Sequence, residues 1–357
     1  MERRHFISTT AAVAAALPLR TFAQSPAKPS SAMFTTLTSS GLGGVAVGNA
    51  VKPTSDQDAH AALSSSWEGG VRMFDTAPFY GFGISERRFG QFLSDKPREE
   101  YHLSTKVGRL LRPDADAQSQ AGMWKDVPPF SPVVDYSASG ARRSVEDSLQ
   151  RLGVESIDIV FIHDLSPDFF GEKWTEHFET ARKGAMVELA KMKEEGLIKA
   201  WGLGVNTLPP ILKTLEVAEP DIFLAACQYS LVHHEESVEK LLPAVAEKNV
   251  SLLIGAPLNF GFLAGRDRYN YGGTIPDGML EKRAAIKKVC DAHKVDLRVA
   301  ALQFSNAPKA VTAVIPGARN AGQAAENAKA LEVAIPADFW AELKSQKLIS
   351  ASAEVPA

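Results

Sequence analysis

Eight short apolar segments alternate with amphipathic stretches along most of the chain, and this alternation restricts the possible fold more than any other feature. The expected strands are residues 41–47, 71–75, 101–107, 156–163, 198–205, 222–228, 250–256 and 311–315. The expected helices are residues 56–68, 85–93, 138–152, 185–195, 207–217, 236–248, 280–293, 296–306 and 321–330. Eight strands with helices between them predict an α/β protein with the (β/α)8 TIM-barrel fold.

The competing arrangement for such an alternation is a doubly wound parallel sheet. That fold binds a dinucleotide at a G-x-G-x-x-G turn between its first strand and its first helix. The segment Gly41-Leu42-Gly43-Gly44 resembles such a turn in composition, but it opens no helix. We therefore expect the barrel.

Composition and charge exclude several classes of protein. The net charge is −3 over 357 residues, without a basic footprint, so we expect no nucleic-acid partner. No apolar run reaches the ~18 residues that cross a bilayer, so we expect no stable membrane anchoring. The two cysteines, Cys227 and Cys290, provide no disulfide framework.

The segment His233-His234-Glu235-Glu236 contains residue types that bind metals. Adjacent side chains in a loop point apart, and no other pair of ligands has a suitable spacing. We therefore expect a solvated loop here and no metal site in the protein.

The first 31 residues are typical of a secretory signal followed by a flexible lead-in. Arg3-Arg4 precedes Phe6-Ile7, and a weakly apolar stretch then leads to a small-residue site that ends at Ala23. The arginine pair resembles the bacterial twin-arginine signal, although a short amphipathic helix with a chance arginine pair is an alternative. We expect export by the twin-arginine machinery to the periplasm, cleavage near Ala23, and a single barrel domain over residues 32–357.

Polar side chains stand at the ends of three neighbouring strands, where the chemistry of a TIM barrel takes place. Asp75 ends the second strand, Lys106 the third and His163 the fourth, and Tyr80 lies in the loop after Asp75. An ammonium group lowers the pKa of a nearby phenol, which makes tyrosine a usable acid or base. The set suits proton transfer at a carbonyl or alcohol oxygen, coupled to hydride transfer from a cofactor. Taken singly, each residue also has a purely structural interpretation.

Several linked motifs together resemble the signature of the aldo/keto reductase superfamily. They are F-D-T-A-P-F-Y-G-x-G-x-S-E at 74–86, S-T-K-V-G at 104–108, R-L-G-x-x-x-I-D at 151–158, F-I-H at 161–163, I-P-G at 315–317 and E-N at 326–327. The resemblance covers roughly residues 34–345. It implies a TIM barrel, Tyr80 as general acid or base, a tetrad completed by Asp75, Lys106 and His163, and a nicotinamide dinucleotide as cofactor.

The same resemblance implies where the cofactor binds. The nicotinamide carboxamide is expected at Asn206 and Gln228, which follow the fifth and sixth strands. The other expected cofactor-binding residues follow the seventh and eighth strands: Pro257, Leu258, Gly261, Gly317, Arg319, Gln323, Glu326 and Asn327.

The chain departs from the common pattern of the family after the seventh strand. Many members carry a tyrosine there that stacks on the nicotinamide, but Gly255 occupies this position, with Phe260 as a nearby candidate for stacking. The variant A-P-L-N at 256–259 resembles the subgroup that oxidises L-fucose and related aldoses, or pyridoxal.

The choice between NAD and NADP depends on the segment after the eighth strand. NADP-preferring members often carry Lys-Ser after Ile-Pro and an arginine three residues before the glutamate. This chain has Gly317-Ala318 and Gln323 at those places, and Glu326 can accept a hydrogen bond from a ribose hydroxyl. NAD is therefore slightly favoured, while Arg319 leaves NADP open because it offers a charge-assisted contact.

Three connections are long enough to form substrate loops: residues 108–136, 165–182 and 259–279, after strands three, four and seven. All three carry aromatic residues, which suit a sugar ring or a pyridine ring. Substrate is expected at Trp124 and His163. We expect an NAD(P)-dependent oxidoreductase acting on an aldose, aldehyde or alcohol, such as pyridoxal. The alternatives are a general NADPH-dependent carbonyl reductase and a non-catalytic cofactor-binding redox sensor.

Export of a dinucleotide enzyme leads to a first prediction. Free dinucleotide is scarce outside the cytoplasm, so either the folded protein carries tightly bound cofactor across the membrane, or export is inefficient and the working pool is cytoplasmic. In the first case, protein isolated from the periplasm and then denatured should release near-stoichiometric NAD or NADP. Release of none would instead indicate a loosely bound cofactor, and either a cytoplasmic site of function or a role without turnover.

Overall fold

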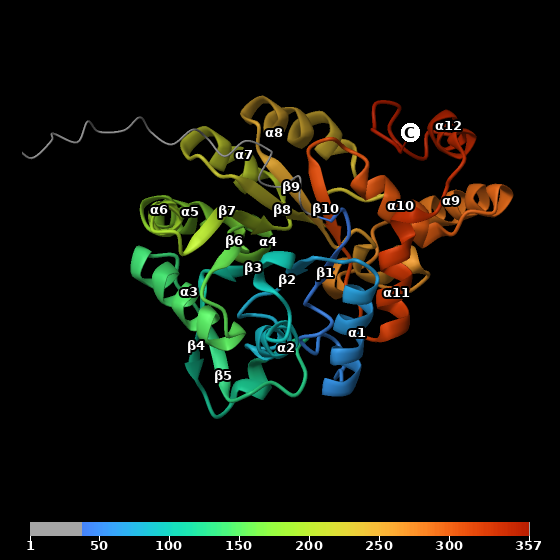
Figure 1. The fold of residues 1–357 in the computed structure, drawn as a ribbon. Coiled ribbons are helices and arrows are strands. Elements are labelled where there is room, and N and C mark those ends of the chain that lie inside the picture. Colours follow the sequence, from blue (N-terminus) through green and yellow to red (C-terminus); the bar gives the residue numbers. More distant parts are fainter. Residues whose placement is uncertain (1–37, 357) are drawn as a thin grey trace, which may run out of the picture.

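Eight parallel strands form the centre of the structure, a computed structural model that describes residues 38–356 (Figure 1). In spatial order they are β1 (Gly41–Gly43), β2 (Met73–Asp75), β3 (His102–Val107), β6 (Ile157–His163), β7 (Ile198–Val205), β8 (Ile222–Ala226), β9 (Ser251–Gly255) and β10 (Val311–Ile315). The backbone N–H of Val314 donates to Ser39 O at 3.0 Å, and that of Gly43 donates to Pro316 O at 3.1 Å. These bonds join the first strand to the last, which confirms the predicted barrel. The expected signal segment lies outside the described residues.

Helices surround the strands, and most begin and end within two residues of the predicted positions (Figure 1). They are α1 (Asp56–Glu68), α2 (Ile84–Leu93), α3 (Ala138–Leu152), α6 (Ala185–Glu194), α7 (Leu208–Val217), α8 (Leu242–Lys248), α9 (Met279–His293), α10 (Leu297–Asn306) and α11 (Ala321–Lys329). The exception is the helix expected at 236–248, which starts as a π-helical turn over Ser237–Leu241. Pro243 has no N–H for the ordinary helical bond, so the turn before it widens.

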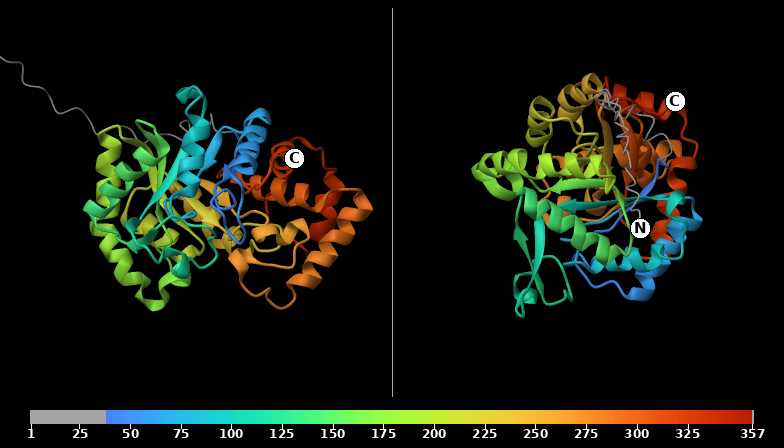
Figure 2. Two further views of the ribbon diagram at one scale, coloured as in Figure 1. Left: turned by 90° about the horizontal axis from the view of Figure 1, so that it is seen from below. Right: turned by 60° about the vertical axis from the view of Figure 1, so that its left-hand side comes forward.

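The long connections contain structure that the alternation did not predict. After β3, the strands β4 (Arg109–Pro113) and β5 (Phe130–Val134) form an antiparallel hairpin that extends away from the barrel (Figure 2). Pro132 lies within β5, where a central strand would lose a hydrogen bond, but a two-stranded hairpin tolerates it. The short helix α4 (Pro167–Phe170) and the helix α5 (Trp174–Lys183) follow β6, and α12 (Ala337–Ser345) lies near the end of the chain.

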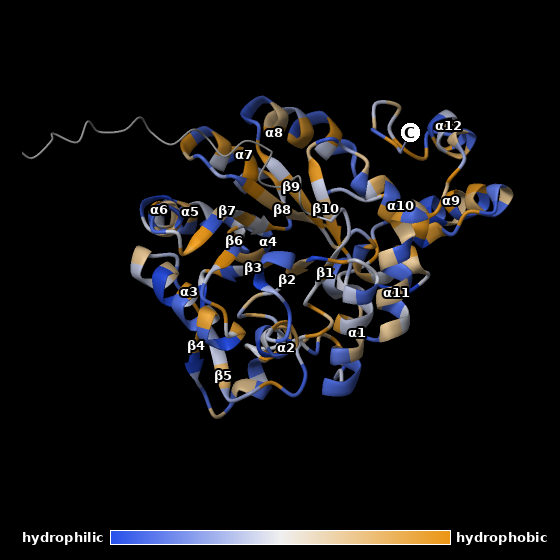
Figure 3. Cartoon of the chain, viewed as in Figure 1, coloured by the Kyte–Doolittle hydropathy of each residue, from blue (hydrophilic) through white to orange (hydrophobic). Residues whose placement is uncertain are grey.

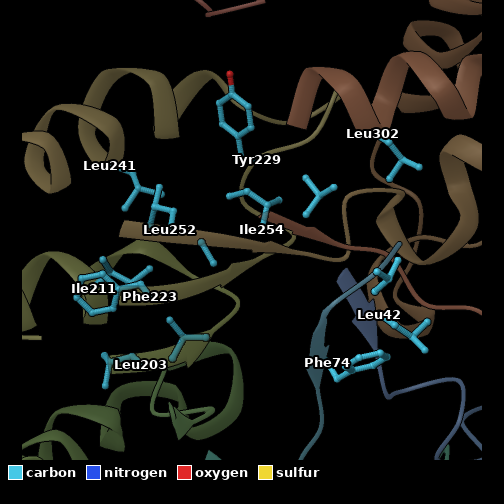
Figure 4. Packing of buried hydrophobic residues seen from close by; sticks show 14 of the residues in the cluster. Leu42, Phe74, Leu203, Ile211, Phe223, Tyr229, Leu241, Leu252, Ile254 and Leu302 are labelled. Atoms are coloured by element: carbon cyan, nitrogen blue, oxygen red, sulfur yellow. The ribbon is translucent and has the colours of Figure 1, made fainter. Parts of the chain in front are cut away.

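Apolar side chains fill two layers, one inside the barrel and one between the strands and the helices. Met73, Ile159 and Phe161 belong to the inner layer. Figure 4 shows part of the outer layer, in which Phe223 and Leu252 project from strands toward the surrounding helices. Polar residues cover the outer faces of the helices (Figure 3). No helix within residues 38–356 is long and apolar enough to cross a membrane.

The segment at 233–236 differs from the solvated loop that the sequence predicts. His234 is fully buried, with its ring centroid 4.8 Å from that of Phe304. Its Nε2 accepts a hydrogen bond from the backbone N–H of Ser350 at 3.0 Å, so Nδ1 carries the proton and donates to Ser230 O at 3.0 Å. Burial lowers the pKa of His234 to about 4, and the ring is therefore neutral at pH 7.

The buried neutral ring makes stability depend on pH. Between pH 6.5 and about 4 the unfolded chain binds a proton at His234 and the folded chain does not, so the free energy of unfolding should fall as pH decreases through this range. Denaturant titrations at several pH values should show a smaller decrease for His234→Gln than for the wild type. His233→Gln, at the less buried neighbour, should keep the wild-type dependence. Equal pH dependence in all three proteins would contradict the assignment.

Candidate active site

Asp75 and Lys106 form a buried ion pair where the neighbouring strands β2 and β3 end. Lys106 Nζ lies 2.8 Å from each carboxylate oxygen of Asp75 and donates to Thr76 O at 2.9 Å. Ser104 Oγ donates to Asp75 Oδ1 at 2.7 Å. Burial lowers the pKa of Lys106, while the Asp75 carboxylate opposes that change. The pair lies at the carboxyl-terminal end of the barrel, which we call the rim.

Tyr80 lies in the turn between β2 and α2, beside this ion pair. Lys106 Nζ is 4.6 Å from the centroid of the Tyr80 ring. The turn packs against Gly48, where a Cβ atom would come within 2.8 Å of the Tyr80 carbonyl carbon, so a larger residue would displace the tyrosine. Glycine at this position therefore fixes the place of the ring.

The pKa of Tyr80 differs from the sequence-based prediction. Burial, and next to it the Asp75 carboxylate, raise this pKa well above 10, whereas the nearby ammonium was expected to lower it. Burial has the larger effect on the pKa, and the Asp75 carboxylate, bonded to Lys106 through both oxygens, offsets part of the attraction between the ammonium and a phenolate. The phenol therefore holds its proton in this arrangement.

His163 ends β6, and its ring centroid lies 5.6 Å from that of Tyr80. The Tyr136 hydroxyl donates to His163 O at 2.7 Å, which fixes the backbone at the end of the strand. Burial first, and then the charges of Lys106 and Arg109, hold the pKa of His163 well below 6.5. The imidazole is neutral at pH 7 and can donate one hydrogen bond to an oxygen atom.

Arg109 and Asp164 form a second buried ion pair at the rim, which sequence reasoning missed. Arg109 Nη2 lies 3.0 Å from Asp164 Oδ2, and the two side chains are 6% and 8% exposed. The guanidinium carbon lies 4.4 Å from the centroid of Phe79 and 4.0 Å from that of Phe169. The position of these charges, just after Lys106 and directly after His163, was the signal available in the sequence.

Trp124 comes from the long connection after β3 and is buried beside the candidate acid. Its ring centroid lies 5.8 Å from that of Tyr80 and 5.5 Å from that of Phe79. The loop of the β4–β5 hairpin thus brings an aromatic ring next to the tetrad.

The two residues expected at the carboxamide lie together after β7 and β8. Gln228 Nε2 donates to Asn206 O, and Asn206 Nδ2 donates to Asp168 Oδ2 at 3.0 Å. The side-chain nitrogens of both residues are therefore bonded within the protein. Neither residue lines the cavity described next.

A cavity of about 450 Å³ lies beside the rim, between the segments that follow β1, β9 and β10. All eight other predicted cofactor residues line it: Pro257, Leu258, Gly261, Gly317, Arg319, Gln323, Glu326 and Asn327. Its size is within the range of small-molecule and cofactor sites. The structure therefore brings together the residues that the sequence places after strands seven and eight.

The cavity has a surplus of positive charge. Arg266, Arg268, Arg298 and Arg319 line it, whereas Glu326 is the acidic residue in the lining. Glu326 is paired with Arg298. Such a lining fits the negatively charged pyrophosphate of a nicotinamide dinucleotide, and the apolar residues beside it fit the rings.

Arg319 already has partners in the protein. Its guanidinium donates to the backbone oxygens of Ala50 and Lys52 at 2.7 Å and to Thr54 Oγ1 at 2.5 Å. The side chain thus ties the loop after β1 to the segment after β10. Its donors are largely used for this structural role.

Two aromatic residues lie near Gly255, where many members of the superfamily carry a tyrosine. Phe260, the expected candidate, and Tyr271 both line the cavity, with ring centroids 5.2 Å apart. Tyr271 also interacts with Cys227, which follows β8. Tyr271 belongs to the aromatic residues that the sequence places in the loop 259–279, but no contact with the cofactor was predicted for it.

Within residues 38–356, no group of three or more His, Cys, Asp or Glu side chains is arranged to hold a metal ion. Both cysteines in this part of the chain are free and buried. The acid–base groups at the rim and the positively charged cavity beside them fit a barrel protein that transfers protons and binds a negatively charged ligand.

Comparisons with known proteins identify the family. The sequence pattern described as "Aldo/keto reductase family" matches residues 41–347. The chain is 34% identical over 319 residues to D-threo-aldose 1-dehydrogenase from a Pseudomonas species, covering 87% of this chain and 94% of that protein. It is 35% identical over 329 residues to pyridoxal 4-dehydrogenase from Microbacterium luteolum, covering 88% of this chain and 95% of that protein.

Solved structures support the same fold. The holo form of an aldo-keto reductase from Bacillus halodurans superimposes with a TM-score of 0.67 at 22% identity, covering 88% of this chain and 93% of that one. The chain belongs to the aldo/keto reductase family, as its motifs predict. It is therefore an oxidoreductase that acts on carbonyl or alcohol groups with NAD(P).

Proposed function

We propose that the protein transfers hydride between a nicotinamide dinucleotide and an aldose, aldehyde or alcohol, as an aldose 1-dehydrogenase does. The observation that carries the proposal is the position of Tyr80 and His163 against the Lys106–Asp75 pair at the rim, beside the positively charged cavity. The similarity to D-threo-aldose 1-dehydrogenase supports an aldose as substrate.

Each residue of the tetrad has a separate task in this proposal. The dinucleotide, when bound, supplies or accepts the hydride. His163 donates a hydrogen bond from its neutral imidazole to the reacting oxygen and so positions the substrate. Tyr80 gives its proton to that oxygen during reduction and takes the proton of the hydroxyl group during oxidation. Lys106 stabilises the phenolate that Tyr80 becomes, and Asp75 keeps Lys106 charged.

A general NADPH-dependent carbonyl reductase is the second candidate. The surplus of arginines in the cavity favours it, because a cation there can bind the 2′-phosphate of NADP. The assembled tetrad is equally suited to either activity. The remaining alternative is a non-catalytic redox sensor. Binding a cofactor without turnover does not require buried acid–base groups at the rim, so their presence favours an enzyme.

The tetrad is tested by removing one hydroxyl group. Tyr80→Phe should lower kcat by about 10²–10⁴-fold because the proton donor is lost, while cofactor binding changes little. Turnover is followed by the absorbance of reduced nicotinamide, and binding by fluorescence. Tyr229→Phe is the matched control, because the Tyr229 hydroxyl is buried without a partner among the described residues. Turnover that survives in the Tyr80 variant would overturn the proposed mechanism.

We propose NAD rather than NADP as the preferred cofactor. Arg319, the residue that left NADP open, is hydrogen-bonded to the loop after β1. Glu326 lines the cavity and can accept a hydrogen bond from a ribose hydroxyl, where a 2′-phosphate would meet its negative charge.

This preference is measurable without turnover. NAD should bind about tenfold more tightly than NADP in fluorescence titrations, and Glu326→Ala should reduce that ratio, because it removes the acceptor and releases Arg298. Glu332→Ala, at an exposed glutamate outside the cavity, should keep the wild-type ratio. Tighter binding of NADP to the wild type would favour the carbonyl reductase instead.

We also propose that the protein acts in the periplasm after export by the twin-arginine machinery. The support is the Arg3-Arg4 pair and the apolar stretch that follows it in the sequence. These positions lie outside the described residues.

A further inference from the structure

We propose that Arg109 and Asp164 are the specificity-determining pair of the site and hold neighbouring hydroxyl groups of an uncharged, polyhydroxylated substrate. This inference rests on the proposed function and names the substrate class of the same site. The tetrad positions the reacting oxygen and exchanges a proton with it, whereas this pair would form hydrogen bonds with the hydroxyl groups next to that oxygen.

The position of Asp164 supports this role. Side chains alternate along a strand, so a residue directly after His163 would ordinarily point to the opposite face. Asp164 instead has a φ of 48°, in the left-handed region that non-glycine residues rarely adopt. As a result its Oδ2 lies 3.6 Å from His163 Nε2. A strained backbone thus keeps a carboxylate beside the imidazole.

Arg109 is fixed against the same part of the rim. Its guanidinium lies against the rings of Phe79 and Phe169, and the Phe79 ring centroid is 6.1 Å from that of His163. The charge of Arg109 also contributes to the low pKa of His163. The guanidinium, the carboxylate and the imidazole therefore lie side by side at the rim.

Hydrogen-bonding capacity remains unused in both members of the pair. Arg109 Nε is buried and has no partner among the described residues. Asp164 Oδ2 accepts from Arg109, and no side chain within residues 38–356 donates to Oδ1. The two residues of this ion pair thus keep one donor and one acceptor without side-chain partners, which matches neighbouring hydroxyl groups, each of which can donate and accept.

The charge balance indicates that the substrate is neutral. Asp164 compensates Arg109, and Asp75 compensates Lys106, so the two buried pairs carry no net charge. A carboxylate or phosphate on the substrate would gain from Arg109 but would meet the negative charge of Asp164. The ring of Phe169, which is 44% exposed and lies against Arg109, suits the C–H face of a sugar ring.

The test compares substrates that differ in hydroxyl groups and in charge. Wild type and Asp164→Asn are assayed with L-fucose, with 4-nitrobenzaldehyde, which has no hydroxyl group, and with 4-carboxybenzaldehyde, its anionic counterpart. The variant should lose about 10–100-fold in kcat/KM for the aldose, mainly through KM, because a hydrogen bond to a charged group is lost. Its kcat/KM for 4-nitrobenzaldehyde should change less than about threefold, and that for 4-carboxybenzaldehyde should rise, because Arg109 loses its counter-charge.

Two further variants separate recognition from folding. Asp158 lies on the same strand as His163, away from the rim, and its carboxylate is paired with Arg98. Asp158→Asn weakens that ion pair and should affect all three substrates equally. The double variant Arg109→Gln/Asp164→Asn removes both charges. Its kcat/KM for the aldose should fall, and its kcat/KM for 4-carboxybenzaldehyde should not rise.

The outcomes distinguish this inference from the proposed function. An equal loss on all substrates in Asp164→Asn, or an unchanged KM for the aldose, overturns the specificity role. A wild type that reduces 4-nitrobenzaldehyde but oxidises no aldose overturns the substrate class and leaves the oxidoreductase proposal standing. A wild type inactive on every substrate with both NAD and NADP overturns the proposed function and this inference with it.

Discussion

The ion pair between Lys106 and Asp75 is the interaction on which the rest of the site depends. It joins the ends of β2 and β3 by charge-assisted hydrogen bonds in a place that solvent hardly reaches. Loss of one partner would leave an uncompensated charge at the base of the rim, which is far more costly than loss of an exposed pair. The pair therefore constrains which side chains can surround it.

Those constraints appear in the electrostatics of the neighbouring groups. The tyrosine keeps its proton because burial, and then the Asp75 carboxylate, raise its pKa, and the histidine stays neutral because it is buried beside two cations. The second ion pair adds a carboxylate whose pKa burial raises to about 6. Water is largely excluded from all these groups, so each hydrogen bond to a substrate has more weight than it would have at the surface.

The sequence was sufficient for the barrel and for the tetrad, because both follow from local patterns. Apolar segments at strand length place the strands, and parallel strands bring Asp75, Lys106 and His163 to the same end. The cavity lining was predicted from the resemblance to the aldo/keto reductases, and the segments after the seventh and eighth strands do lie together in the barrel.

The remaining features depend on contacts that no local pattern contains. The burial of His234 requires Ser350, 116 residues further along the chain. The pairing of Arg109 with Asp164 depends on the left-handed backbone conformation of Asp164, which an aspartate adopts less readily than a glycine. The hairpin after β3 was hidden by Pro132, which argues against a strand in most settings. The charge of Lys106 was visible in the sequence, but the burial that raises the pKa of Tyr80 was not.

The closure between β1 and β10 has a thermodynamic consequence. The first strand is only three residues long, and it meets the last strand through few backbone bonds. The cavity spans this seam, since Gly43 and Ala46 line one side of it and Ile315 and Gly317 the other. A ligand held there touches both ends of the barrel at once and binds the closed form alone. By mass action, such a ligand stabilises the closed barrel. The free energy needed to separate β1 from β10 would therefore rise with ligand concentration.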